Sequence, residues 1–131
     1  MDINEDCARA LLMLVADSFD VGSGKRSKPV RLRRITDDAR LSDYTEAQIY
    51  TAAFFLKTNK FLTIVAKSPA DAELVAPRMY VFTGITAKGL TYLSKISDDT
   101  TWRKLKSVLG NVLEKTLPVI ISTAIQVGIK L

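Results

Sequence analysis

Few side chains in this sequence could perform catalysis, and their setting does not favour it. The 131 residues include no histidine, which excludes Ser-His-Asp catalysis and removes the usual zinc and haem ligands. The single cysteine, Cys7, has no such base to activate it and is expected to be a small buried residue of a first helix. With one cysteine no intramolecular disulfide can form, which is typical of a reducing compartment.

Two aspartate pairs leave carboxylate catalysis formally open. Asp37-Asp38 and Asp98-Asp99 both stand where helices are expected to begin, and the helix dipole favours acidic residues there. Gly22 and Gly24 form a lone G-x-G that lacks the third glycine of a dinucleotide-binding fingerprint. We therefore predict a protein that is not an enzyme, with no catalytic residue, no metal site and no cofactor.

A basic run is the first candidate binding site. Residues 25–34 contain six lysines and arginines: Lys25, Arg26, Lys28, Arg31, Arg33 and Arg34. Clustered cations of this kind are what contact with nucleic-acid phosphates requires. The alternative is a solvated loop followed by the outward face of a strand. The net charge of +5 permits contact with double-stranded DNA or an anionic membrane but does not demand it.

The helix expected from Thr45 to about residue 58 is the second candidate. In a DNA-binding helix-turn-helix protein this element would enter the major groove, and Gln48, Thr51 and Lys57 are its candidates for DNA contact. Lys57 is its one basic residue, and the loop expected over residues 67–77 carries acidic residues. Both features count against reading of base pairs by this helix.

Adjacent phenylalanines make the same helix a candidate protein-binding surface. Phe54 and Phe55 cannot both point at one core centre, so one of them, taken here as Phe55, is expected to contact a protein partner. The alternative is that helices near the C-terminus bury both rings.

The C-terminal part is unusually apolar. Its apolar residues recur at helical spacing, and Pro118 fits the first turn of a last helix. The residues expected to form an interface are Trp102, Leu105, Leu109, Val112, Ile120, Ile121 and Ile125. Such a surface must be covered, and three alternatives stay open: self-association, packing on the rest of the chain, and contact with a membrane surface.

Caps and periodicity predict the elements that position these residues. Asn4 caps a first helix with an apolar stripe (Ala8, Leu11, Leu12, Val15, Phe19), and Thr45 with Gln48 forms a capping box before the core stripe Ile49, Ala53 and Leu56. Strands are expected at residues 30–33, 61–65 and 79–82, and a short helix at 36–42. Thr86 caps a helix carrying Leu90, Leu93 and Ile96, and another begins at Asp98-Asp99.

Two stretches carry a resemblance to a protein family. Residues 45–62 look like the third helix and following strand of bacterial winged-helix proteins. Residues 85–106 resemble an uncharacterised bacterial and phage winged-helix family of unknown function, in which a T-x-x-G helix precedes a D-D-T-x-W motif. The matching positions are Thr86, Gly89, Asp98, Asp99, Thr100 and Trp102. Lys60 departs from the pattern, because such proteins usually have glycine before the strand. The resemblance implies an architecture and no activity.

These observations together predict an α+β protein: a winged helix-turn-helix domain over residues 1–97, with a two- to three-stranded antiparallel sheet and a C-terminal helical extension over 98–131. We expect a cytoplasmic DNA-binding regulator of bacterial or phage origin, dimeric through its C-terminal helices. The alternatives are a protein-interaction adaptor or inhibitor on the same fold, and a membrane-associated protein. The acidic N-terminus does not resemble a signal peptide, and no apolar run approaches the roughly 20 residues of a membrane span.

Overall fold

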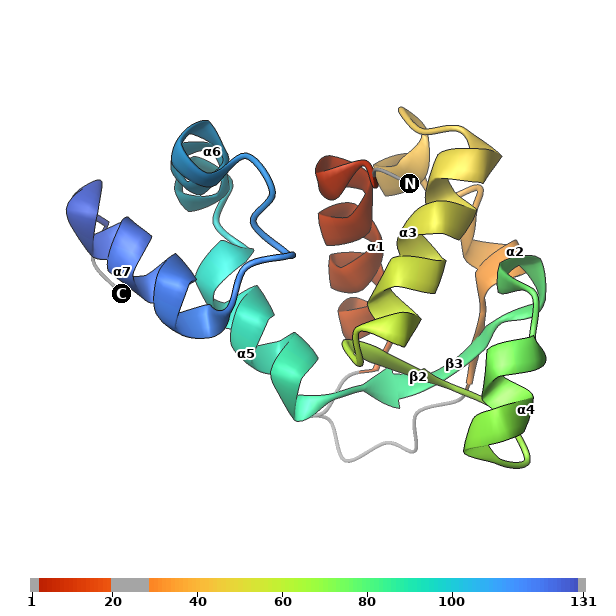
Figure 1. Cartoon of the computed structure of the whole chain (residues 1–131). Helices are drawn as coiled ribbons and strands as arrows, with labels where there is room; N and C mark the ends of the chain where they lie inside the picture. Colours follow the sequence, from red (N-terminus) through yellow and green to blue (C-terminus); the bar gives the residue numbers. More distant parts are fainter. Residues whose placement is uncertain (1–2, 20–28, 130–131) are drawn as a thin grey trace. The chain divides into compact units, whose positions relative to one another are not determined.

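Side-chain caps set the starts of the first two long helices in the computed structural model, which describes residues 3–19 and 29–129 (Figure 1). Helix α1 (Glu5–Ser18) begins after Asn4, whose side-chain oxygen accepts from the amide of Cys7 at 3.0 Å. Helix α3 (Glu46–Thr58) begins at the predicted capping box, in which Thr45 and Gln48 exchange hydrogen bonds of 3.1 and 3.0 Å. Both predicted caps are confirmed, because each satisfies amides that a helix leaves unpaired.

The chain forms two compact units, Met1–Leu90 and Thr91–Leu131, and α5 (Ala87–Ile96) runs from one into the other. The division therefore falls inside this helix, earlier in the chain than residue 97. Besides α1 and α3, the first unit contains β1 (Val30–Arg31), α2 (Leu32–Ile35), the 3-10 helix η1 (Ala39–Leu41), β2 (Leu62–Ile64), α4 (Pro69–Leu74), the 3-10 helix η2 (Pro77–Met79) and β3 (Val81–Ile85). The second unit contains α6 (Asp99–Leu109) and α7 (Leu117–Gln126).

The sheet of the first unit has three antiparallel strands in the order β1-β3-β2. Val30 pairs with Phe82 on one side of β3, and Leu62 pairs with Ile85 on the other. The register of β2 on β3 shifts between Thr63 and Ile64, which marks a β-bulge. The predicted α+β class and the antiparallel sheet are confirmed, and β2 is an edge strand.

Helices α1 and α3 lie side by side and supply most of the core of the first unit (Figure 1). The predicted stripe of α1 is buried: Ala8, Leu11, Leu12 and Val15 are fully inaccessible and Phe19 is nearly so. The predicted stripe of α3, Ile49, Ala53 and Leu56, is buried as well. Periodicity identified both inward faces because burial repeats with the helical turn.

A tight junction joins α3 to β2 and β3 to α5. Lys60 has φ 64°, the one positive φ among the described non-glycine residues. Phe61 follows, fully buried, and its carbonyl oxygen accepts from the Thr86 amide at 3.0 Å, while the Thr86 hydroxyl donates to the Lys60 carbonyl at 2.6 Å. The same hydroxyl oxygen accepts from the Gly89 amide at 3.0 Å, so the predicted Thr86 cap is confirmed. The position where the family resemblance expects glycine is thus the position that takes the left-handed conformation.

Between α1 and α3 the expected boundaries are wrong in detail. The strand expected over residues 30–33 ends at Arg31, because Leu32 turns into the core and starts α2, a single turn. The helix expected over 36–42 is only η1, capped by Asp38, whose carboxylate accepts from the Arg40 amide at 2.9 Å. Elements this short are stabilised by packing against the rest of the protein, and the local sequence pattern does not show which side chain will be buried.

The connection between β2 and β3 also differs from expectation. It was expected as a loop, but it contains α4, which starts after Ser68 with proline in its first turn. The strand expected over 79–82 begins only at Val81, because η2 holds Pro77–Met79 and the Tyr80 amide donates to the Pro77 carbonyl at 3.0 Å. Leu90, expected in the apolar stripe of α5, is 45% exposed.

In the second unit, α6 and α7 pack together. Helix α6 begins at the predicted Asp98-Asp99 pair and ends at Leu109, where Gly110 takes φ 72°. Val112 therefore lies beyond the helix that was expected to carry it, although its side chain is buried. Pro118 lies in the first turn of α7, as predicted. The Tyr92 hydroxyl donates to the Lys115 carbonyl at 2.9 Å and ties α5 to the α6–α7 connection.

We expect Gly89→Ala to destabilise the protein by about 1–3 kcal/mol, because an added Cβ would lie 2.5 Å from the Phe61 carbonyl oxygen and 2.7 Å from a side-chain carbon of Ile85. Urea unfolding measures this. Gly84→Ala is the control, since its Cβ would meet nothing closer than 3.8 Å. Equal midpoints for the two variants would contradict the close packing at the junction.

We expect Lys60→Gly to stabilise the protein by about 0.5–1 kcal/mol. Glycine removes the left-handed penalty of about 1–2 kcal/mol at φ 64° but adds chain entropy to the unfolded state. Thermal unfolding tests this against Lys60→Ala, which removes the same charge and keeps the penalty. A gain shared by both variants would show that charge, and not backbone conformation, is responsible.

Candidate functional site

The residues considered above for catalysis lie in a buried core or at helix starts. Cys7 is fully buried, and burial raises the pKa of its thiol to about 11, so that it stays protonated at neutral pH. Asp38 caps η1, and the hydrogen bond from the Arg40 amide holds the pKa of its carboxyl below the usual value. Asp98 and Asp99 stand at the start of α6. Within residues 3–19 and 29–129, no group of cysteine and carboxylate side chains could hold a metal ion.

Half of the predicted basic run can be placed. Lys25, Arg26 and Lys28 lie outside the described residues. Arg31, Arg33 and Arg34 are all exposed, at the end of β1 and on α2. Helix α2 contacts η2, which brings a further exposed arginine, Arg78, to the same part of the first unit. Within the described residues none of these four arginines forms an ion pair, so their charges face solvent.

The residues of α3 expected to contact DNA are engaged elsewhere. Gln48 closes the capping box and, with Thr51, faces Ile3 and Asn4 beside the start of α1. Lys57 is only 8% exposed in its side chain and lies 3.8 Å from a carboxylate oxygen of Glu73. The one basic residue of α3 is therefore directed to α4 and does not project into solvent.

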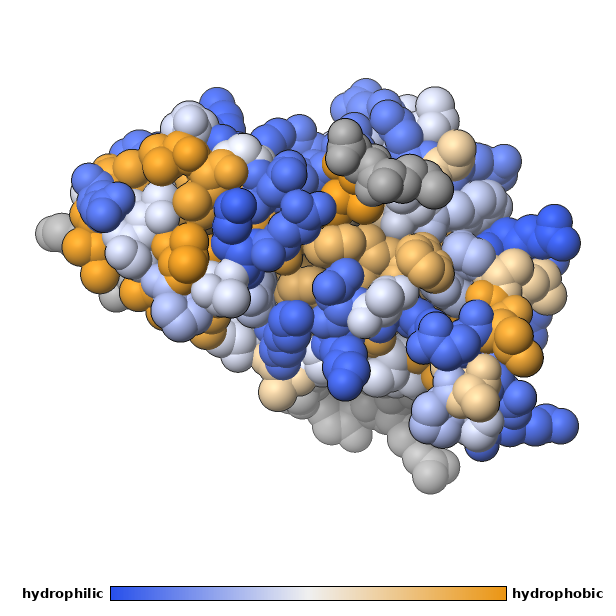
Figure 2. Space-filling model, viewed as in Figure 1, coloured by the Kyte–Doolittle hydropathy of each residue, from blue (hydrophilic) through white to orange (hydrophobic). Residues whose placement is uncertain are grey.

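Phe54 is the phenylalanine that α3 presents to solvent, and Phe55 is not. Phe54 is 49% exposed, whereas the half-buried Phe55 ring stacks on Phe61 with centroids 6.1 Å apart. Figure 2 shows the resulting hydrophobic surface over α3 and a second hydrophobic group beside α4. Tyr50, Thr51, Phe54 and Pro77 line a shallow cavity of about 280 Å³, which we call the α3 pocket.

Helix α4 is the feature of this region that the prediction missed. Its acidic residues were expected to oppose DNA from a loop, but one of them, Glu73, lies 3.8 Å from Lys57 of α3. The signal was present: Ser68 accepts from the Asp71 amide at 3.2 Å, and Ser-Pro before an acidic residue is a typical helix start. Leu74 at the end of α4 is 83% exposed.

Most of the predicted C-terminal interface is already buried within one chain. Trp102, Leu105, Val112 and Ile120 are at most 3% exposed, and Leu109 and Ile121 are half-buried. Ile125 alone of the predicted set is largely exposed, at 66%. Self-association or membrane contact stays a prediction for this residue; Val108 on α6 and Val119 on α7, outside the predicted set, are exposed as well. In the described part of the chain, no helix combines the length and the apolar character that crossing a bilayer requires.

Comparison of the chain with protein-family models, with curated proteins and with solved structures finds no match. The resemblance to the winged-helix family therefore stays a prediction, and the function must be argued from the geometry of the first unit.

Proposed function

We propose that this chain is a winged-helix binding module that acts by docking a protein partner and carries no catalytic site. The element order supports the winged-helix assignment: α1, β1, η1 at the place of the expected second helix, α3, β2 and β3 occur in the predicted order, with α2 added after β1 and α4 and η2 added between β2 and β3. The sheet order supports it too, because β3 lies between the strand that follows α1 and the strand that follows α3. In this architecture α3 is the element offered to a ligand.

The single observation that carries the choice of partner is the composition of the exposed face of α3. Phe54 is half exposed beside an apolar cavity, and Lys57, the only cation of the helix, is turned to Glu73. A helix that reads the major groove presents arginine, lysine, asparagine or glutamine to the base edges. A half-exposed aromatic ring beside an apolar cavity is instead typical of the anchor residues of protein interfaces.

The size of the α3 pocket fits one or two apolar side chains of a partner. Its volume is about 280 Å³, and Tyr50 and Pro77 give it rigid walls. Binding would cover the exposed half of the Phe54 ring, which contributes about 1 kcal/mol from apolar burial alone. Thr51 also lines the pocket and gives it a hydroxyl group.

The immobilised wild-type chain is expected to retain a partner protein from a nuclease-treated extract of its native cells. We expect Phe54→Ser to abolish this retention, because the variant loses the apolar anchor. The urea midpoint should correspond to a stability loss of only about 1 kcal/mol, since half of the ring is exposed already, so the variant should stay folded. Leu74→Ser is the matched control: it removes an exposed apolar side chain outside the pocket and should keep the partner. Retention unchanged by Phe54→Ser, or lost equally with Leu74→Ser, contradicts the proposal.

A second candidate function, contact with double-stranded DNA, rests on the arginines. Arg31, Arg33 and Arg34 are exposed and without ion-pair partners in the described part of the chain, and Arg78 lies on the adjacent η2. Guanidinium groups in this state are suited to phosphate contact, which is independent of base sequence. This surface is separate from the α3 pocket in its residues, so the two candidates can be tested one at a time.

For the DNA candidate we expect replacement of Arg31, Arg33 and Arg34 by glutamine to reduce the slope of log affinity against log salt by about 3, since each phosphate contact contributes about 0.9. Duplex binding by gel shift at several salt concentrations measures this. Replacing Lys95, Arg103 and Lys104 by glutamine removes the same charge from the second unit and is the control. An identical loss in both triple variants would assign the binding to net charge and not to this cluster.

A further inference from the structure

A groove runs along the free edge of β2 in the first unit. Its walls are the end of α3 with Lys57 and Lys60, the strand β2 itself, and the start of α4 with Pro69 and Ala72. Its volume is about 580 Å³, and Lys67 lies at its outer end. None of the residues of the α3 pocket lines it, so we call it the β2 groove and treat it as a separate site.

The hydrogen bonds of β2 show which of its backbone groups face the groove. The Phe61 carbonyl accepts from Thr86, and the Val65 amide donates to the Val81 carbonyl at 2.9 Å, so the odd-numbered residues face β3. Backbone direction alternates along an antiparallel strand, which turns the amides and carbonyls of Leu62 and Ile64 to the opposite side. Within the described residues these groups have no strand partner, because β2 ends the sheet. Leu62 is only 2% exposed, so the groups that an added strand can reach are those of the half-buried Ile64.

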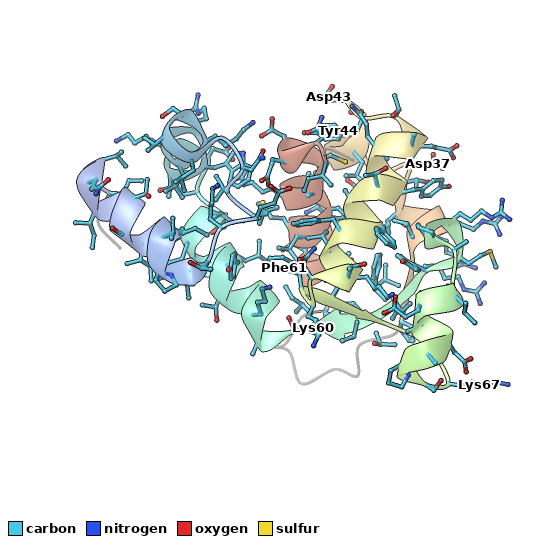
Figure 3. The ribbon with its side chains drawn as sticks, viewed as in Figure 1. Asp37, Asp43, Tyr44, Lys60, Phe61 and Lys67 are labelled. Atoms are coloured by element: carbon cyan, nitrogen blue, oxygen red, sulfur yellow. The ribbon has the colours of Figure 1, made fainter. Side chains whose placement is uncertain are left out.

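The charged side chains that line the groove are all lysines. Three lysines line the groove and no acidic side chain does. Lys57 is paired with Glu73, whereas Lys60 and Lys67 are exposed and form no ion pair within the described residues. Figure 3 shows Lys60 where β2 follows α3 and Lys67 at the other end, beside α4. An extended chain laid against β2 would therefore meet a cation near each of its ends.

We propose that the β2 groove binds an extended acidic segment of another protein, which adds to the sheet as a strand next to β2. The main-chain groups of Ile64 would pair with the segment, and its carboxylates would meet Lys60 and Lys67. Strand addition of this kind takes affinity from backbone hydrogen bonds and selectivity from side chains. The two lysines also disfavour edge-to-edge pairing between copies of this +5 chain, so the edge accepts a strand of opposite charge. The proposal goes beyond the α3 site and does not depend on it.

The probe is a fluorescein-labelled eight-residue peptide in which glutamate alternates with valine, and the readout is fluorescence anisotropy with the full chain. We expect binding that weakens as salt rises. The double variant Lys60→Gln with Lys67→Gln should lower the affinity about tenfold, because each exposed ion pair contributes a fewfold. Arg103→Gln with Lys104→Gln removes the same charge from the second unit and should leave the affinity unchanged. The same peptide with lysine for glutamate should not bind.

A backbone variant separates strand addition from charge attraction. Ile64→Pro removes an amide that faces the groove and not one that pairs with β3, so the sheet can be kept while the added strand is blocked. Circular dichroism and urea unfolding check that the variant is folded; the lysine variants test the proposal independently if it is not. We expect the folded variant to lose peptide binding at least tenfold.

Three results would overturn the proposal. Peptide affinity that is equal in the wild type and in folded Ile64→Pro would show that no strand is added. An equal loss in the two charge variants would show that attraction is unspecific. A lysine double variant that loses affinity for duplex DNA but not for the peptide would identify the groove as a phosphate contact. Phe54→Ser should leave peptide binding intact, which separates failure here from failure of the α3 proposal.

Discussion

Two donors of Thr86 hold the turn after α3: its amide donates to the Phe61 carbonyl at 3.0 Å and its hydroxyl to the Lys60 carbonyl at 2.6 Å, and the arrangement of the first unit depends on this pair of contacts. It joins the end of α3 to the end of β3 and so sets where β2 begins to pair. Gly89 allows the close approach, because any side chain there would collide with the Phe61 carbonyl. Lys88 makes two further contacts here. Its ammonium lies 4.6 Å from the centre of the Phe61 ring, a cation–π contact, and donates to the Asn59 carbonyl.

This junction decides what α3 offers to a ligand. With Leu56 and Phe61 fixed in the core, the opposite side of the helix presents Phe54 to solvent. The Lys57–Glu73 pair then ties α4 to the end of α3 and removes the only lysine of the helix from the solvent face. Glu73 is exposed, so this pair adds little to stability. Helix α4 nevertheless lies beside β2 and forms one wall of the β2 groove.

Capping residues and apolar periodicity correctly predicted the parts of the fold that depend on contacts within a few residues. Asn4, Thr45 and Thr86 were identified as caps because an unpaired amide at a helix start needs an acceptor within three residues. The stripes of α1 and α3 were identified because apolar spacing matches the helical turn. Helix α4 was missed although Ser68 and Pro69 mark its start, since two prolines and several small residues indicated a loop. The exposed phenylalanine was assigned to Phe55 and is Phe54, because adjacency alone does not say which ring reaches the core.

The sequence by itself determined the starts of α1, α3 and α5 and the inward faces of α1 and α3, because each follows from hydrogen bonds and burial within a few turns of chain. Only the tertiary structure decided the functional surfaces. The direction of Lys57 depends on Glu73, sixteen positions further along the chain, and the stacking of Phe55 depends on Phe61 beyond a turn. The free edge of β2 exists because β3 pairs on its other side. Such surfaces depend on contacts between distant segments, and no short stretch of sequence specifies them.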